Sequence, residues 1–564
     1  MNSQKLFILF SIINHVVQCS SCKPQVNISQ GIVQGVKLKS KSNRDFSAFI
    51  GIPYGEPPIG DLRFSSPVPK KKWTGVYHAD SEKLKIQCPQ VDNSKVLGQE
   101  DCLYLNVFTP RTNFDPSNTN ESRSISFTVM VWIHGGAFIV GSNSFDEYGP
   151  NFFLDKDIVL VTINYRLGVL GFLSTADLVS PGNFGLKDQV LALKWVQSNI
   201  HSFGGDPSKV TIFGESAGGM SVSFHTLSDS SNGLFHQYIL QSGNALCSCA
   251  YRDKTDFKSD VDEVAKVLDC PVSNSTLTVN CLKNVNFKTL LNASNFYDLR
   301  KPELTWIPTN EIASKDAFLT DSPENLLRDN KLKDYPFISG NVADEGLYVT
   351  SEYFVNKSSL PINKVFNNSL NLSFKQYGTA NKEDQFKNII NDYYFSGFVK
   401  KNDTDVKYLK NLTKFVSDSM FLYPDEILIN KIAKTAESPF YRFKFGYRGT
   451  MNRIYLIFNT KENIGVGHSN DVLYLFNYGP LHNMTQSDEH IVTVMIDLWT
   501  SFAIDGKPFS NALKNPHLWQ NYKNSESFLQ IGNKSDNMDP TVTLEKEFAS
   551  NRLDFWKKNF PVEL

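Results

Sequence analysis

One short segment restricts the fold of this chain more than any other. Gly214-Glu215-Ser216-Ala217-Gly218 follows an apolar run at Val210–Phe213 and precedes a segment that can be helical. A strand that turns sharply into a helix strains the backbone of its central residue, and a side chain on either flanking glycine would clash. The pattern therefore predicts an exposed Ser216 hydroxyl at the end of a sheet, where it is a candidate nucleophile.

The neighbouring sequence predicts an α/β fold with a mostly parallel sheet flanked by helices. Branched apolar runs at Val129–Ile133 and Ile158–Ile163 are typical of buried strands. Asp188–Asn199 has apolar residues at helical spacing, and it lies between two predicted strands. No repeat or low-complexity linker divides the chain. The least regular stretch, from about residue 274 to residue 414, is interpreted as surface elaboration on one large domain.

A serine hydroxyl needs a positioned base to remove its proton at neutral pH. Among the ten histidines, His468 is the best candidate. It lies in the glycine-flanked segment Gly465-Val466-Gly467-His468, and it follows the serine in the chain, as this fold requires. The other histidines have no distinguishing surroundings.

The segment Trp132–Phe138, which contains His134-Gly135-Gly136-Ala137, follows a predicted strand. Small residues there allow backbone N–H groups to approach a substrate oxygen. We expect an oxyanion hole formed by the N–H groups of Gly136, Ala137 and Ala217, each contributing roughly 3 kcal/mol of transition-state stabilisation.

The N-terminus predicts export. Lys5, the apolar run Leu6–Val17 and the small residues that follow are typical of a cleavable signal peptide over residues 1–21, which leaves 22–564 as the mature domain. Eleven Asn-x-Ser/Thr sequons predict a secreted glycoprotein. They lie at Asn27, Asn120, Asn274, Asn292, Asn356, Asn367, Asn371, Asn402, Asn411, Asn483 and Asn533. Because the chain ends in Glu-Leu, the lumen of the endoplasmic reticulum is the alternative location.

The cysteines also fit an oxidising compartment. Cys88 with Cys102, and Cys270 with Cys281, form two short-range pairs that could close loops. Cys22, Cys247 and Cys249 have no evident partner.

Charge and hydropathy narrow the possible partners. With 57 basic and 58 acidic residues the net charge is -1, which argues against nucleic acid as a ligand. After the predicted signal peptide, no run reaches the roughly 18 apolar residues of a membrane anchor. We expect a small-molecule substrate and no cofactor or metal, and the oligomeric state is left open.

Taken in chain order, these segments resemble the type B carboxylesterases and the cholinesterases. The motifs that carry the resemblance span nearly the whole mature chain. They are Phe49–Tyr54, Gln99–Val107, Asn164–Gly168, Phe203–Pro207, the Ser216 segment, His468 and Phe555-Trp556. Gly465–Phe476 resembles the insect carboxylesterases most. The resemblance implies a single α/β-hydrolase domain in which the two cysteine pairs are disulfides.

The resemblance also assigns residues. It identifies Glu345, in Gly340–Gly346, as the acid of a Ser-His-Glu triad, with the adjacent Asp344 as a rival. Ser242 matches a serine that lies near the acid and the base in the family. Cys249 stands where many relatives have a bulky tryptophan in the acyl pocket. Glu215 differs from the glutamine typical of juvenile hormone esterases, which argues against that specific hormone role.

The sequence thus predicts a secreted serine carboxylesterase that works through an acyl-enzyme. Ser216 attacks the ester, His468 moves the proton and Glu345 orients the imidazole. Neutral aliphatic or aryl esters, including xenobiotics or lipid-derived signals, are the expected substrates, because the loop Pro89–Asp101 lacks the aromatic residue that holds choline in cholinesterases. The alternatives are a non-catalytic binding relative of the same fold and a lipase with an interfacial lid.

Overall fold

The structure, a computed structural model, describes most of the predicted mature domain. The described residues are 23–80, 85–92, 94–114, 126–294, 304–355, 358, 360–396, 405–458, 462, 464–478, 484–533 and 538–564. The predicted signal peptide, Cys22 and the sequons at Asn120, Asn356, Asn402 and Asn483 lie outside these residues.

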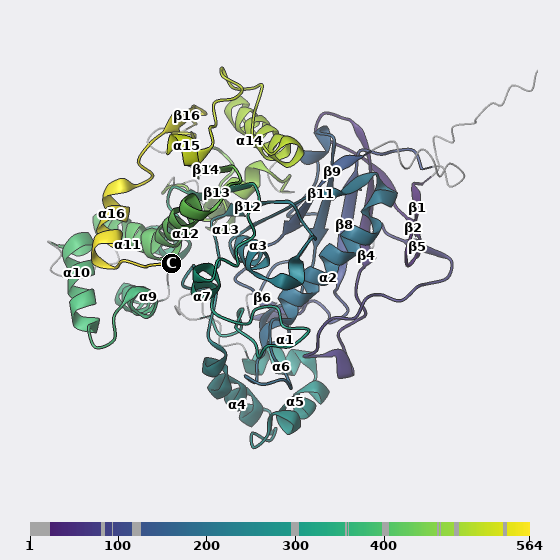
Figure 1. Cartoon of the computed structure of the whole chain (residues 1–564), viewed down its shortest axis with the longest axis horizontal. Coiled ribbons are helices and arrows are strands. Elements are labelled where there is room, and N and C mark those ends of the chain that lie inside the picture. Colours follow the sequence, from purple (N-terminus) through teal and green to yellow (C-terminus); the bar gives the residue numbers. More distant parts are fainter. Residues whose placement is uncertain are drawn as a thin grey trace, which may run out of the picture.

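An eleven-stranded sheet runs through the centre of the molecule (Figure 1). Its order is β16-β15-β14-β13-β12-β11-β9-β10-β8-β4-β3. The strands are β3 (Val36–Lys39), β4 (Asp45–Pro53), β8 (Tyr104–Thr109), β9 (Phe127–Ile133), β10 (Ile158–Ile163), β11 (Gly205–Glu215), β12 (Gln237–Gln241), β13 (Phe337–Val342), β14 (Phe440–Phe445), β15 (Phe528–Ile531) and β16 (Val542–Glu545). All pairs from β10 to β15 are parallel, whereas the pairs at both ends of the sheet are antiparallel.

Both faces of the sheet are covered, because alternate residues of its central strands enter two different hydrophobic cores. Val129, Val131 and Ile133 of β9 pack in the core that contains α2 (Phe184–Asn199) and α3 (Ala217–Leu227). Met130 and Trp132 of the same strand pack in the core that contains α14 (Gln486–Asp505). A sheet buried on both faces explains the continuous apolar runs in the sequence. The predicted mostly parallel α/β architecture is confirmed.

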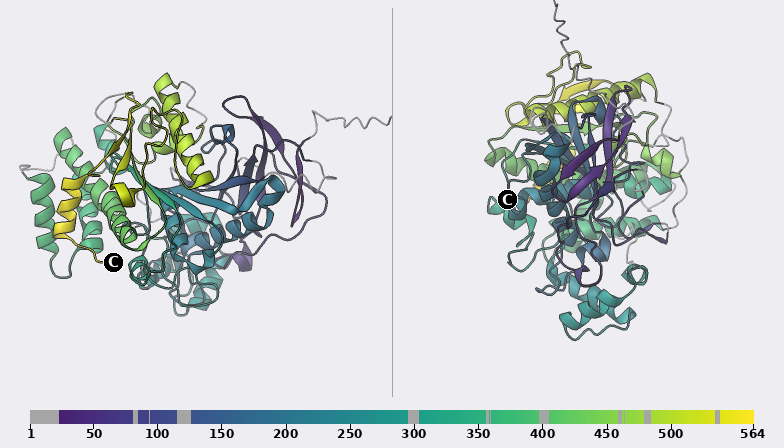
Figure 2. Two further views of the ribbon diagram at one scale, coloured as in Figure 1. Left: turned by 45° about the horizontal axis from the view of Figure 1, so that its top comes forward. Right: turned by 90° about the vertical axis from the view of Figure 1, so that its right-hand side faces the viewer.

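Two smaller sheets flank the main one. β1 (Gln25–Ile28), β2 (Gly31–Gln34) and β5 (Val76–His78) form a sheet at one end of the molecule (Figure 2). β6 (Gln90–Asp92) and β7 (Lys95–Leu97) form a hairpin in which Gln90 pairs with Leu97.

Further helices connect the strands. They are α1 (Gly168–Phe172), α4 (Lys258–Val267), α5 (Ser275–Asn284), α6 (Phe287–Ser294), α7 (Pro323–Arg328), α8 (Leu347–Phe354), α9 (Ile362–Tyr377), α10 (Glu383–Phe395), α11 (Val406–Ser417), α12 (Tyr423–Thr435), α13 (Arg453–Phe458), α15 (Tyr522–Ser525) and α16 (Ser550–Asn559). A π-helical turn, Asp418–Leu422, joins α11 to α12. Helices α4, α5 and α6 lie together on one side of the sheet, and α9, α10 and α16 lie at the end opposite β1 (Figures 1 and 2).

Local sequence explains where α14, the longest helix in the described residues, begins and ends. The Thr485 hydroxyl accepts a hydrogen bond from the N–H of Asp488, and the Asp488 carboxylate accepts one from the N–H of Thr485. This reciprocal cap satisfies N–H groups that the first turn leaves free. The helix ends at Gly506, whose left-handed φ of 69° suits a residue without a side chain.

The prediction that residues 274–414 are irregular is wrong for the part that the structure describes. This stretch contains helices α5 to α11, and β13 is a strand of the central sheet. Its polar residues lie on the outer faces of amphipathic helices: in α11, Leu409, Leu412 and Val416 are buried, while Lys410 and Lys414 are exposed.

Both predicted disulfides, Cys88–Cys102 and Cys270–Cys281, are present. Within the part of the chain that the structure describes, Cys247 and Cys249 form no disulfide. Across the described residues, no helix is both long enough and apolar enough to cross a membrane.

Candidate active site

Ser216 occupies the sharp turn between β11 and α3, as the sequence predicts. Its backbone has a φ of 58° and a ψ of -126°, a conformation that L-residues rarely adopt. A methyl group on Gly214 would lie 2.5 Å from the carbonyl carbon of Gly218, and one on Gly218 would lie 2.0 Å from the carbonyl oxygen of Ile133. Both glycines are therefore required by close backbone contact. Ser216 is partly exposed, whereas Glu215 and Ala217 are buried.

The structure brings His468 and Glu345 into direct contact. Glu345 is fully buried and lies just before α8. One of its carboxylate oxygens accepts a hydrogen bond from the N–H of Val342 at 2.9 Å, and the other lies 2.6 Å from Nδ1 of His468. Asp344, the rival acid, instead accepts a hydrogen bond from the N–H of Val466 at 3.1 Å. Asp344 thus holds the loop that carries the histidine, and Glu345 holds the imidazole.

The imidazole is also enclosed on its other sides. The Phe421 ring, from the π-helical turn, lies 4.8 Å from it between centroids, and the Tyr348 ring lies 5.8 Å away. Nε2 of His468 faces Oε1 of Glu215 at 3.2 Å. The described residues contain no hydrogen bond between His468 and Ser216, although both side chains line the same cavity. Catalytic hydrogen bonds are often long in structures without substrate.

Three buried carboxyl groups surround His468 and shift its pKa. Burial alone lowers the pKa of His468, but the charge of Glu215 and the hydrogen bond and charge of Glu345 raise it to about 9. Burial raises the pKa of Glu215, and the nearby His468 opposes that rise. Asp471 accepts a hydrogen bond from the Gln241 amide at 2.6 Å. Burial, together with the charge of Glu215, raises the pKa of Asp471 to about 7.

The predicted oxyanion hole lies beside the serine. A methyl group on Gly135 would lie 3.1 Å from Cβ of Ser216, so the turn after β9 touches the elbow directly. The turn has left-handed backbone at Gly136 (φ 106°) and Ala137 (φ 55°). The N–H groups of Gly136, Ala137 and Ala217 make no hydrogen bond within the described part of the chain. All three donors are therefore available to a ligand.

Ser242 lies beside the elbow, because the N–H of Ser216 donates to the carbonyl of Gln241 at 2.9 Å. Ser242 is buried and has a left-handed φ of 51°. Its hydroxyl has no hydrogen-bond partner among the described residues, so the predicted proximity to the acid and the base is not accompanied by a direct hydrogen bond to either.

Ser216, His468 and the three backbone donors line a cavity of about 530 Å³. Apolar and aromatic side chains make up much of its wall, and the charged side chains of Asp92, Glu147, Glu352 and Arg453 also line it. The apolar lining residues include Leu97, Val140, Met220, Leu304, Leu347, Tyr348, Met420, Phe421, Ile454, Ile457 and Phe458. Cys249 also lines the cavity. The cavity can therefore accept an apolar molecule and present it to a serine, an imidazole and three backbone donors.

Comparison with known proteins identifies the family. The model of the carboxylesterase family matches residues 22–556. The chain belongs to the carboxylesterase family. It is thus a carboxylic ester hydrolase of the α/β-hydrolase fold, and the family predicted from the sequence motifs is confirmed.

Relatives from insects and mammals match this chain along nearly their whole length. Esterase FE4 of Myzus persicae is 35% identical over 91% of this chain and 90% of its own length. Juvenile hormone esterase of Tribolium castaneum is 34% identical over 95% of both chains. Carboxylesterase 1D of Rattus norvegicus is 32% identical over 91% of this chain and 90% of its own.

Sequence reasoning missed the part that Glu215 plays in the site. In the sequence Glu215 stands out only as a difference from juvenile hormone esterases, yet in the structure it contacts the imidazole and accepts a hydrogen bond from the Ser469 hydroxyl at 2.6 Å. A sequence signal existed, since a residue next to the nucleophile must lie near the base. Asp471 is three residues after His468 and carried no such signal.

Proposed function

We propose that this carboxylesterase hydrolyses neutral aliphatic or aryl esters through an acyl-enzyme on Ser216, with His468 as base and Glu345 as its partner. One observation carries the proposal. The imidazole that Glu345 holds at 2.6 Å shares its cavity with a partly exposed serine in a strained elbow and with three unpaired backbone N–H groups. Each element corresponds to one requirement of acyl transfer.

In the first half of the reaction, Nε2 of His468 takes the hydroxyl proton while Oγ of Ser216 bonds to the acyl carbon. The carbonyl oxygen becomes an oxyanion, and the N–H groups of Gly136, Ala137 and Ala217 donate to it. The bond to the alcohol oxygen then breaks, and the imidazolium gives that oxygen its proton. In the second half, water replaces the alcohol and the same steps release the acid.

Glu215 has a role in this sequence. Nε2 lies 3.2 Å from Glu215 and Nδ1 lies 2.6 Å from Glu345, so the imidazolium formed when Nε2 accepts the proton is flanked by two carboxylates. Because opposite charges within a few ångströms favour the charged form, Glu215 and Glu345 both stabilise the imidazolium of the transition state. The raised pKa of His468 supports this role.

The preference for uncharged esters is supported by the apolar and aromatic side chains that line the cavity around Ser216, among them Met220, Leu304 and Phe421. The disulfide loop Pro89–Asp101, which begins beside the cavity, has no aromatic residue that could hold a quaternary ammonium group. Secretion is part of the proposal, and the two disulfides support an oxidising compartment.

The test of catalysis compares three proteins expressed with their own N-terminus: wild type, Ser216→Ala and Ser223→Ala. Ser223 lies two turns along α3, is buried and has no side-chain hydrogen bond within the described residues. With a panel of nitrophenyl esters of increasing acyl length, wild type and Ser223→Ala should hydrolyse the esters, and Ser216→Ala should not. Comparable turnover by Ser216→Ala would refute the nucleophile. Absence of hydrolysis by wild type would favour a non-catalytic binding relative.

The test of specificity compares kcat/KM for butyrylcholine and for 3,3-dimethylbutyl butyrate, which has the same shape without the charge. The uncharged ester should be preferred. A clear preference for choline would mean that other groups in the cavity bind the cation, and the proposed substrate class would then be wrong.

A further inference from the structure

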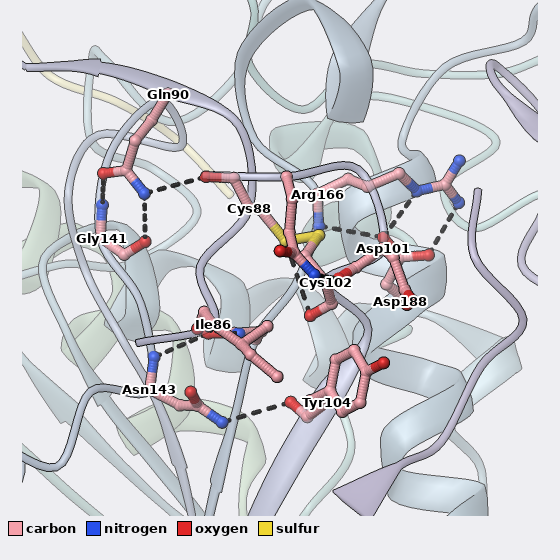
Figure 3. The surroundings of a disulfide bond; sticks show 12 residues. Ile86, Cys88, Gln90, Asp101, Cys102, Tyr104, Gly141, Asn143, Arg166 and Asp188 are labelled. Carbon is pink, nitrogen blue, oxygen red and sulfur yellow. Dashed lines mark hydrogen bonds and ion pairs between the residues drawn. A yellow bond between two sulfur atoms is a disulfide. The ribbon is translucent and has the colours of Figure 1, made fainter. Parts of the chain in front are cut away.

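The side chain of Gln90 joins the Cys88–Cys102 disulfide to the turn that carries the oxyanion donors (Figure 3). Its amide nitrogen donates to the carbonyl of Cys88 at 3.1 Å and to the carbonyl of Gly141 at 3.0 Å. Its amide oxygen accepts from the N–H of Gly141 at 2.9 Å. Gln90 is 6% exposed, so water competes little for these three hydrogen bonds.

Gly141 closes the oxyanion turn, defined here as residues 135–141. Inside the turn, the carbonyl of Gly136 accepts hydrogen bonds from the N–H groups of Ile139 and Val140. Gly141 has a φ of 111°, and a methyl group on it would lie 2.6 Å from the carbonyl oxygen of Gly135. The two ends of the turn are thus in close contact. Because the two ends touch, we expect a displacement of Gly141 to change the position of Gly135 and of the N–H of Gly136.

The other end of the connection is rigid. Cys102 lies two residues before β8 in the central sheet, and the disulfide fixes Cys88 to it. Gln90 itself begins β6, where it pairs with Leu97. One disulfide and three hydrogen bonds therefore connect the start of β8 to the oxyanion turn through the side-chain amide of Gln90.

We propose that Gln90 is a positioning residue for ester hydrolysis, which holds the oxyanion turn where the N–H groups of Gly136 and Ala137 bind the tetrahedral oxyanion. The inference rests on the proposed function of Ser216 and its oxyanion hole. Gln90 acts through Gly141 and takes no part in the proton transfers. Its contribution is made in the transition state, because only there does the substrate oxygen carry the charge that the turn binds.

A primary amide fits this position because it must both donate and accept. Glutamate at position 90 would keep the acceptor for the N–H of Gly141, but its carboxylate would face the carbonyls of Cys88 and Gly141. Alanine would remove all three hydrogen bonds. The two substitutions therefore weaken the same contact in different ways, and Gln90→Glu does so with almost no change in volume.

The test measures kcat and KM for a neutral aryl ester with wild type, Gln90→Ala and Gln90→Glu, each standardised by titration of Ser216 with a fluorophosphonate. It also measures inhibition by a trifluoromethyl ketone, which adds to the serine as a tetrahedral oxyanion, and by the matching methyl ketone. We expect kcat to fall about 10-fold or more with KM within about 2-fold, since loss of a whole oxyanion donor costs about 100-fold to 1,000-fold. Inhibition by the trifluoromethyl ketone should weaken in parallel with kcat, and inhibition by the methyl ketone should not.

Gln99→Ala is the matched control. Gln99 belongs to the same disulfide loop and is exposed, and among the described residues its side-chain amide donates only to the carbonyl of Asp101. It should behave as wild type. Standardised kcat within about 2-fold of wild type for both Gln90 variants, or an equal loss of affinity for the two ketones, would overturn the role of Gln90. Failure of wild type to hydrolyse any ester would instead refute the proposed function.

Discussion

Replacement of Glu215 by glutamine should move the pH dependence of ester hydrolysis to lower pH. The substitution keeps the shape of the side chain and an oxygen that can accept from the Ser469 hydroxyl, but it removes the negative charge 3.2 Å from Nε2 of His468. The neutral imidazole is the active form of the base, so activity is lost as the pH falls through the pKa of His468. That pKa is raised to about 9, well above the ordinary value of about 6.5. The acid limb of the wild type should therefore lie above the range of pH 6 to 7 that an unperturbed histidine would give.

The size of the change follows from the separation of the charges. Two opposite unit charges 3.2 Å apart attract each other by about 1.3 kcal/mol in water and by about 5 kcal/mol at an effective dielectric constant of about 20. One pKa unit corresponds to about 1.4 kcal/mol. The side chains are only 13% and 7% exposed, so the water value is a lower bound. In Glu215→Gln the acid limb of kcat/KM should therefore shift to lower pH by at least about 1 unit. Glu345 and Asp471 still face the imidazole in this variant and keep part of the rise in its pKa.

The assay is kcat/KM for an uncharged ester between pH 5 and pH 10, in wild type, Glu215→Gln and Glu263→Gln. Glu263 lies on the exposed face of α4 and has no side-chain partner among the described residues, so its substitution removes the same charge far from the site. Only Glu215→Gln should shift the limb. A limb that stays in place, or moves to higher pH, would show that Glu215 does not stabilise the imidazolium.

Three further substitutions test the packing around the site. Gly218→Ala would place a methyl group 2.0 Å from the carbonyl oxygen of Ile133, so thermal unfolding should show a loss of about 1–3 kcal/mol; an unchanged Tm would contradict the required close contact. Arg166→Met would leave the fully buried Asp188 without the guanidinium that donates to both of its oxygens (Figure 3). Denaturant unfolding should then show a loss of about 3–5 kcal/mol in the free energy of unfolding. A loss below about 1 kcal/mol would mean that Asp188 is neutral. Cys249→Trp should reduce kcat/KM for long acyl esters far more than for acetate, and equal effects on both would place Cys249 away from the acyl group.

The sequence predicts the parts of this molecule whose constraints are local. The elbow is marked by two glycines four residues apart, and the central strands are marked by continuous apolar runs, so both are visible in a short window. β10 has the bounds that the apolar run predicts, and β9 and β11 extend beyond their predicted runs by a few residues. The cysteine partners are close in the sequence, at separations of 14 and 11 residues. Glu345 needed the family resemblance, because no local rule selects an acid 123 residues away from its histidine.

The remaining features depend on contacts between distant segments. The approach of Glu215 to His468, the burial of Asp471 and the bond between Gln90 and Gly141 arise only when separate loops meet at one edge of the sheet. The π-helical turn that brings Phe421 against the imidazole has no apolar period of its own that would reveal it. The sequence predicts irregular structure for residues 274–414 because the many polar residues there obscure the helical spacing of the apolar ones. In α11, for example, the apolar residues form one narrow face.

The central claim is that Ser216 is the nucleophile, and a covalent adduct tests it most directly. The wild-type protein is treated with a fluorophosphonate, digested and analysed by peptide mass spectrometry, in parallel with Ser216→Ala. A phosphonyl group forms a bond to the oxygen of an activated serine as fluoride leaves, and the peptide that contains Ser216 should gain that mass in step with the loss of esterase activity. The account predicts complete modification of this one peptide in the wild type and none in Ser216→Ala. Loss of activity with the label on another serine, or full labelling of Ser216 with activity retained, would contradict it.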